Sequence, residues 1–95
     1  MARYIALLSF TEKGSLHLKE SPSRAHAFDE LAAKSGVTVE GQFWTLGRYD
    51  GVLILKAESE HQILHLLAEL ASRGNVRTET MQAFTDKDFA TILKS

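Results

Sequence analysis

The fold of this chain is decided by the stretch WTLGRYDGVLIL, residues 44–55, in which a strand, a turn flanked by glycines and an apolar strand follow one another. Gly47 and Gly51 can adopt positive φ at little cost, and the side chain of Asp50 can hydrogen-bond to nearby backbone groups. Because this turn chemistry lies between two runs of strand-forming residues, it predicts a β-hairpin at the centre of the domain.

One helix is predicted on each side of this hairpin. Ser21 is a good N-cap and Pro22 suits the first helical position, so a first helix is expected to begin here and to end near Gly36. Ser59 and Gln62 match a capping box, which predicts the start of a second helix. Both helices carry apolar residues at helical spacing, so each is expected to pack on a sheet.

The order of elements predicts the fold class. The expected strands are residues 4–10, 37–46, 51–57 and 75–84, and Thr85 is expected to cap a short final helix. Two strand–helix–strand units joined by a hairpin predict an α+β protein, a ferredoxin-like βαββαβ sandwich with an antiparallel sheet and both helices on one face. Residues 1–95 are expected to form a single domain.

Composition excludes several classes of protein. The 95 residues include 44% hydrophobic and 24% charged residues with a net charge of −1, which is typical of a soluble globular domain. The 11 lysines and arginines are scattered, so no nucleic-acid partner is expected. The chain has no cysteine, which excludes disulfides, thiolate metal sites and thiol nucleophiles.

The N-terminal sequence bears on location. Its apolar run is short and is followed closely by Glu12 and Lys13, whereas a signal peptide or a membrane span needs a longer run. We therefore expect a cytoplasmic protein without a membrane partner.

The strands predict self-association. Residues 4–10 and 51–57 are apolar on both faces, yet the helices of such a sandwich cover one face only. A domain of this size also buries only roughly 60–65% of the surface of its unfolded chain. A second copy that packs sheet to sheet would cover the remaining face, so a homodimer or larger homo-oligomer is expected.

Four segments together resemble a known family. They are Tyr4-Ile5, Glu20-Ser21-Pro22, WTLGRYD at residues 44–50, and GNVRTET at residues 74–80 leading to Ala83-Phe84-Thr85. In these segments the chain resembles the GYD-domain proteins, small bacterial proteins of about this length. The resemblance implies a ferredoxin-like subunit related to the dimeric α+β barrels, in which two sheets close around a central cavity, and it implies no established activity. In this chain Arg48 separates Gly47 from Tyr49.

Polar side chains are expected to gather on the uncovered face of the sheet. Arg77 and Glu79 lie two residues apart on the fourth strand, so they share a face. If Glu40, Gln42 and Trp44 lie on the same face of a neighbouring second strand, these residues form a pocket wall for a small polar or aromatic molecule. The same side chains also suit a dimer interface, where tryptophan and arginine are enriched.

The hairpin carries two further candidates. Tyr49 and Asp50 could orient a substrate or act as acid and base, since loops often carry functional groups. The alternative is structural: Asp50 satisfies backbone groups of the turn, and Tyr49 packs its ring against the edge of the sheet.

The histidines predict no metal centre. His61 and His65 are four residues apart on the second helix, a spacing at which two imidazoles can share a metal ion. Both lie opposite the leucine stripe, and a third ligand is missing, so no metal and no cofactor are expected. His17 lies in a loop with no visible partner.

The functional hypothesis is a homo-oligomeric module that binds a small organic ligand at the open face of the sheet. Its expected ligand-binding residues are Trp44, Tyr49, Asp50, Arg77 and Glu79. One alternative is a cofactor-independent isomerase or oxygenase, which rests on analogy of fold, and another is a purely structural interaction protein. Motifs for a serine nucleophile, a phosphate loop or a dinucleotide are absent from the sequence.

Overall fold

The predicted hairpin joins two strands of an antiparallel sheet. A computed structural model describes residues 1–94, and Ser95 lies outside the described residues. The hairpin connects β2 (Thr38–Trp44) to β3 (Gly51–Ala57). The other elements are β1 (Ala2–Phe10), α1 (Glu12–Leu16), the 3-10 turn η1 (Leu18–Glu20), α2 (Ser21–Lys34), α3 (Glu60–Ser72), β4 (Val76–Gln82) and α4 (Asp86–Leu93).

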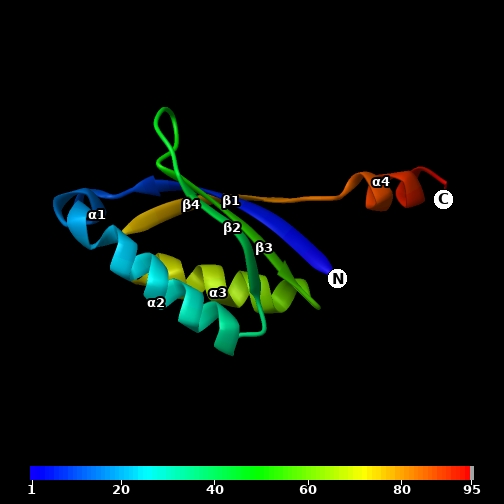
Figure 1. The fold of residues 1–95 in the computed structure, drawn as a ribbon, viewed down its shortest axis with the longest axis horizontal. Helices are drawn as coiled ribbons and strands as arrows, with labels where there is room; N and C mark the ends of the chain where they lie inside the picture. Colours follow the sequence, from blue (N-terminus) through cyan, green and yellow to red (C-terminus); the bar gives the residue numbers. More distant parts are fainter. Residues whose placement is uncertain (95) are drawn as a thin grey trace.

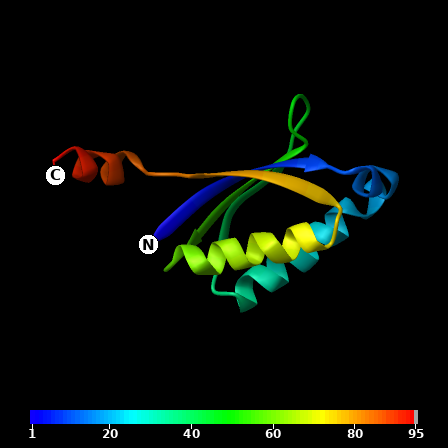
Figure 2. The ribbon, with the colours of Figure 1, turned by 180° about the vertical axis from the view of Figure 1, so that it is seen from behind.

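The topology confirms the ferredoxin-like prediction. The four-stranded sheet has the order β2-β3-β1-β4, and every neighbouring pair is antiparallel. Helices α2 and α3 lie side by side on one face of this sheet (Figures 1 and 2). The predicted pairing with a second copy involves another chain, so it stays a prediction. Among residues 1–94, no helix is long and apolar enough to cross a membrane.

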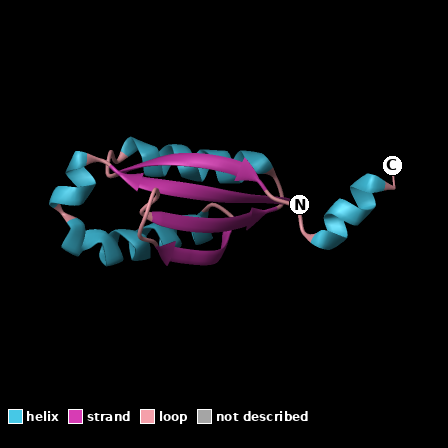
Figure 3. Cartoon of the chain, turned by 90° about the horizontal axis from the view of Figure 1, so that it is seen from above, coloured by secondary structure: helices cyan, strands magenta, loops and turns pink. Residues whose placement is uncertain are grey.

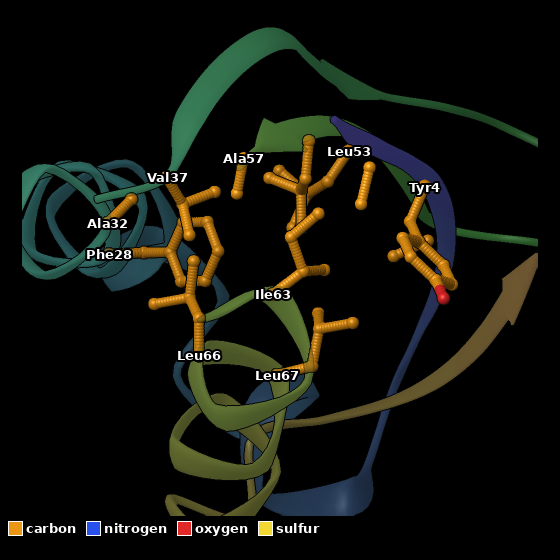
Figure 4. Close-up of a cluster of buried hydrophobic side chains, with 12 residues drawn as sticks. Tyr4, Phe28, Ala32, Val37, Leu53, Ala57, Ile63, Leu66 and Leu67 are labelled. Carbon is orange, nitrogen blue, oxygen red and sulfur yellow. The ribbon is translucent and has the colours of Figure 1, made fainter. Parts of the chain in front are cut away.

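The core lies between the sheet and the two long helices (Figure 4). Leu55 of β3 and Ile63 and Leu66 of α3 are the largest side chains that are fully buried. Burial alternates along β3, because successive side chains of a strand point to opposite faces. We call the side covered by α2 and α3 the helix face. It is lined by Ala2, Tyr4, Ala6, Leu53, Leu55 and Ala57.

The opposite side of the sheet has no helix over it in the described chain, and we call it the open face (Figure 3). The alternation and the strand register place six large apolar side chains there: Ile5, Leu7, Phe43, Val52, Ile54 and Met81. Phe43 is 58% exposed and Met81 is 48% exposed. This apolar surface agrees with the prediction that the first and third strands are apolar on both sides.

A bulge in β2 reverses the predicted faces of that strand. Val39 is paired with Leu55 and Gly41 with Ile54, so Glu40 is an extra residue between them. Residues beyond the bulge therefore face the opposite way from simple alternation. Trp44 is paired with Gly51, and both lie on the helix face. The prediction that Glu40 and Trp44 share a face is wrong for this reason.

The predicted proximity of the second and fourth strands is also wrong. β2 and β4 form the two opposite edges of the sheet, with β3 and β1 between them. Arg77 and Glu79 are paired with Ser9 and Leu7, which places both on the open face as expected. The strand order and the bulge together separate Trp44 from Arg77.

Helix α4 stands apart from the rest of the molecule. The chain after β4 continues past the end of the sheet before α4 begins, and α4 lies clear of α2 and α3 (Figures 1 and 3). The N–H of Ala83 donates to the carbonyl of Arg3 at 2.9 Å, which keeps this segment in line with the sheet. Thr85 caps α4 through a capping box with Asp88, so the predicted cap is confirmed.

Candidate functional site

A cavity of about 220 Å³ lies between the helix face and α2, at the end of the sheet where β1 leaves and β4 enters. Most of its wall is apolar. The large apolar side chains are Leu8, Phe10, Phe28, Leu31, Leu53 and Leu70. Ala25 of α2 also lines the cavity, and its small side chain leaves the space open beside the larger residues. An apolar hollow with a few polar groups is the usual form of a small-molecule site.

Trp44 forms one side of this cavity. Its indole Nε1 donates to the hydroxyl of Ser21 at 2.9 Å, and the side chain is left about half exposed. Ser21 is buried at the first turn of α2, with 8% of its surface exposed. This contact fixes the indole against α2, so Trp44 is held at the boundary between cavity and solvent.

The prediction that Ser21 is the N-cap of α2 is wrong. Ser21 belongs to the helix, Glu20 precedes it in helical conformation, and no side chain caps the helix. The preceding turn η1 runs directly into α2, and the N–H of Ser21 donates to the carbonyl of Leu18. The hydroxyl of Ser21 is therefore available to Trp44 rather than to the helix terminus.

Polar groups with a positive balance stand at the edge of the cavity. Arg24 donates to the carbonyl of His17 at 2.8 Å and lies 3.4 Å from the carbonyl of Gly14, so the end of α1 orients its guanidinium. Arg73 also lines the cavity, and its side chain is exposed. His17 is not among the lining residues, and its Nδ1 lies 3.1 Å from Glu20.

Asp50 is the carboxylate of the cavity wall, and it also fastens the hairpin loop to β1. Its Oδ2 accepts the N–H of Phe10 at 2.8 Å, and its own N–H donates to the carbonyl of Leu8 at 2.7 Å. The Thr45 N–H donates to the Asp50 carbonyl at 2.9 Å and closes the loop. The structural role predicted for Asp50 is thus present, with β1 as its partner in addition to the turn.

Tyr49 lies on the other side of the sheet. Its phenolic hydroxyl donates to Glu79 of β4, across β1, and the guanidinium of Arg48 lies 5.6 Å from the ring centroid. The hydrogen bond to Glu79 raises the pKa of Tyr49, and burial adds to the effect. A phenol with a raised pKa is a weaker acid at neutral pH, so this contact does not favour proton transfer by Tyr49.

The five predicted ligand-binding residues therefore fall into two groups. Trp44 and Asp50 line the cavity on the helix face. Tyr49 and Glu79 meet on the open face, and Arg77 is exposed on the same face. Contact of any of them with a ligand stays a prediction.

The histidines lie on the surface. His65 Nε2 is 3.8 Å from Glu69, and His26 Nε2 is 3.0 Å from Glu30. His61 is exposed at the start of α3. Within residues 1–94 there is no group of three or more His, Cys, Asp or Glu side chains that could hold a metal ion.

Four polar residues that line the cavity are not among the site residues predicted from the sequence: Ser21, Arg24, Arg73 and Asn75. Arg24 follows Ser21 by three residues and precedes Phe28 by four, so the three lie on one side of α2. Arg24 and the small Ala25 interrupt the apolar stripe of α2, and this interruption is the feature of the sequence that could have indicated a cavity beside the helix. Arg73 and Asn75 lie in the turn after α3, where the sequence gives no such signal.

Comparison with known proteins agrees with the predicted resemblance. The family model described as the GYD domain matches residues 4–93. A Thermus thermophilus protein named glutamine synthetase and cystathionine beta-lyase binding protein is 35% identical over 95 residues, which cover 99% of this chain and 100% of that relative. No solved structure gives a significant match. The chain therefore belongs to the GYD domain family.

Proposed function

We propose that the protein binds a small organic acid with an apolar body in the cavity beneath α2. The observation that carries this proposal is an apolar hollow with two arginines in its wall. The site differs from the one expected on the open face, but it keeps Trp44 and Asp50 as lining residues. Tyr49, Arg77 and Glu79 are assigned to the open face.

Size and charge define the class of ligand. A volume of about 220 Å³ is below the roughly 300–1,000 Å³ of pockets for drug-sized molecules, so the ligand is small. Asp50 accepts a backbone hydrogen bond, and two arginines, Arg24 and Arg73, are among the lining residues, so the charge of the wall is positive on balance. A carboxylate on the ligand can accept bidentate hydrogen bonds from a guanidinium. A medium-chain fatty acid or an aromatic acid has both features.

Trp44 provides the test, because it is the only tryptophan of the chain and lines the cavity. Titration with octanoate is expected to change the fluorescence of Trp44 until it saturates. Octylamine at the same concentrations is expected to leave this fluorescence unchanged. Ala25→Leu fills the cavity and should abolish the change, whereas Ala68→Leu on the exposed side of α3 should leave it. Equal responses to the acid and the amine, or an unaffected Ala25→Leu variant, would contradict the proposal.

A second function, protein binding, is favoured by the relative from Thermus thermophilus, whose name states two enzyme partners. We propose that this chain binds the glutamine synthetase or the cystathionine beta-lyase of its own organism. Biosensor measurements with each purified enzyme, and an unrelated enzyme as control, test this. Equal signals from all three would reject it.

The geometry does not favour the predicted alternative of a cofactor-independent isomerase or oxygenase. The carboxylate of Asp50 accepts the N–H of Phe10 in the cavity wall, and the phenol of Tyr49 lies on the other face of the sheet. These two groups therefore do not converge on one substrate as an acid and a base would have to do.

We further propose that the open face pairs with the open face of a second copy. Six large apolar side chains lie there, and a two-fold pairing would cover the same residues of both copies at once. Two of the charges at its margin pair within the chain, since Arg3 contacts Glu40 at 2.8 Å. The apolar centre of the open face is therefore proposed as the main source of affinity between the two copies.

A further inference from the structure

Helix α4 has an apolar side that its own chain does not cover. Phe89, Ile92 and Leu93 have the spacing of a single stripe on a helix, and they are 53%, 47% and 70% exposed. Phe84, just before the helix, is 52% exposed. No residue of α4 is buried.

A helix of this length needs a packing partner. Eight residues are fewer than the ~12–15 at which isolated helices become even marginally stable in water. A capping box at Thr85 and Asp88 stabilises its first turn, but it leaves the apolar stripe in solvent. Tertiary packing of the stripe would supply the missing stabilisation.

Its own subunit does not supply that packing. Among the described residues, the only ion pair between α4 and the rest of the chain is Arg3–Asp88, with N and O 3.9 Å apart. The radius of gyration is 14.1 Å, whereas a compact chain of this length has about 12 Å. The longest dimension of 49 Å runs through the arm formed by residues 83–93 (Figures 1 and 2).

The position of the arm indicates its partner. Arg3 is paired with Lys56 and alternates with the buried Tyr4, so the Arg3 side chain lies on the open face. Since Asp88 lies beside Arg3, α4 begins at the margin of the open face. A second copy seated on this face would cover the margin at which α4 begins, so it would lie within reach of the uncovered apolar stripe of α4.

We propose that α4 is an exchanged arm. In a homodimer paired through the open faces, the stripe Phe89, Ile92 and Leu93 of each subunit packs against the other subunit. By two-fold symmetry each subunit gives one arm and receives one. This inference rests on the open-face pairing proposed above and is independent of the cavity and its ligand.

The first experiment measures the dimer dissociation constant of the full chain by analytical ultracentrifugation. Phe89→Ser with Ile92→Ser is expected to weaken the dimer about 30-fold or more, because two large apolar side chains are lost from the interface. Lys87→Ser with Thr91→Ser changes the opposite side of the same helix, and less than about a 3-fold effect is expected. Equal constants for the first variant and the natural chain would overturn the proposal.

A second experiment distinguishes exchange from folding back. The photo-crosslinking amino acid p-benzoyl-phenylalanine is placed at position 89 of the full chain and irradiated. A covalent dimer on a denaturing gel is the expected product. Crosslinks confined to single chains would show that α4 packs on its own subunit and would overturn the proposal.

A third experiment tests the exchange of α4 and the open-face pairing independently of each other. Ile54→Lys places a charge at the centre of the open face and is expected to dissociate the dimer. If Ile54→Lys weakens the dimer while the α4 variant does not, the open-face pairing stands and the arm exchange falls. A natural chain that sediments as a monomer at all concentrations overturns both, whereas the fluorescence titration of the cavity remains a separate result.

Discussion

Among the six glycines of the chain, Gly14 has the least room for a side chain. A Cβ atom at this position would lie 2.1 Å from the carbonyl oxygen of Asn75. That carbonyl already accepts the N–H of Thr11 at 3.0 Å, and the Thr11 hydroxyl donates to the carbonyl of Gly74 at 2.6 Å. Both contacts fix α1 against the start of β4, so the backbone cannot give way without losing them.

We expect Gly14→Ala to lower stability by about 1–3 kcal/mol, the usual cost of overpacking. In a domain of this size the midpoint of thermal unfolding should fall by roughly 5–20 °C. Circular dichroism against temperature measures it, with Ser15→Ala on the exposed side of α1 as the matched control. Equal unfolding midpoints for the two variants would contradict the prediction, because they would mean that α1 can shift away from Asn75 without loss of stability.

The Arg3–Glu40 pair predicts a pH dependence. Its two hydrogen bonds, of 2.8 and 3.2 Å, lower the pKa of Glu40. A lowered pKa in the folded state means that the pair stabilises the fold above the ordinary glutamate pKa of about 4.3 and that this contribution is lost as pH falls through the lower folded value. Glu40→Gln should therefore lower the unfolding midpoint by a few degrees at pH 7.

The midpoints of thermal unfolding of Glu40→Gln and of the natural chain should become equal as the pH is lowered below about 4. Thermal unfolding at a series of pH values measures it, and Glu58→Gln, at an exposed position, is the control. If the difference between the two midpoints stays the same at acidic pH, the Arg3–Glu40 ion pair is not its cause.

At the level of elements, α3 joins the two layers of the sandwich. Leu66 is fully buried against the sheet, whereas Leu64 of the same helix is 48% exposed. Leu66→Ala leaves a cavity in the core and should lower the free energy of unfolding by about 2–5 kcal/mol.

Leu64→Ala removes the same atoms on the solvent side and should change the free energy of unfolding by about 0.5 kcal/mol or less. Urea denaturation compares the two variants. Similar losses from both would place the two leucines in equivalent surroundings and contradict the described packing.

The elements could be predicted because their signals are local. The four strands, the capping box at Ser59 and Gln62 and the final helix at Thr85 all depend on residues that are close in sequence. The cap at Ser21 could not be predicted, since a preceding turn and a distant indole decide what its hydroxyl does.

The candidate site was less predictable, because its composition depends on pairing between strands. The alternation of residues in β2 is uninterrupted in the sequence, and only the register against β3 shows that Glu40 is extra. Simple alternation therefore predicts the wrong face for Trp44, although the sequence does identify Trp44 as a candidate site residue. For Arg77 and Glu79 the same alternation predicts the correct face, since β4 pairs with β1 without a bulge.

At the level of the whole molecule, two uncovered apolar regions predict an assembly. They are the open face and the stripe of α4. We expect the Ile54→Lys variant to be a monomer in sedimentation measurements, because a charge without a partner is costly to bury in the interface. Leu64→Lys on the outer side of α3 should leave the assembly unchanged. If both variants sediment alike, the open face is not the interface.

The bulge at Glu40 has a consequence for how this protein can diverge. Deleting Glu40 would remove only the extra residue, because Gly41, Phe43 and Trp44 would keep their partners on β3 and therefore their faces. If β2 instead kept every residue and paired without the bulge, its residues after Val39 would slip by one position, and Trp44 would move to the open face while Phe43 moved to the helix face. The bulge thus decides which aromatic ring borders the cavity and which one borders the proposed interface, and the strand can lose the codon of Glu40 without changing that choice.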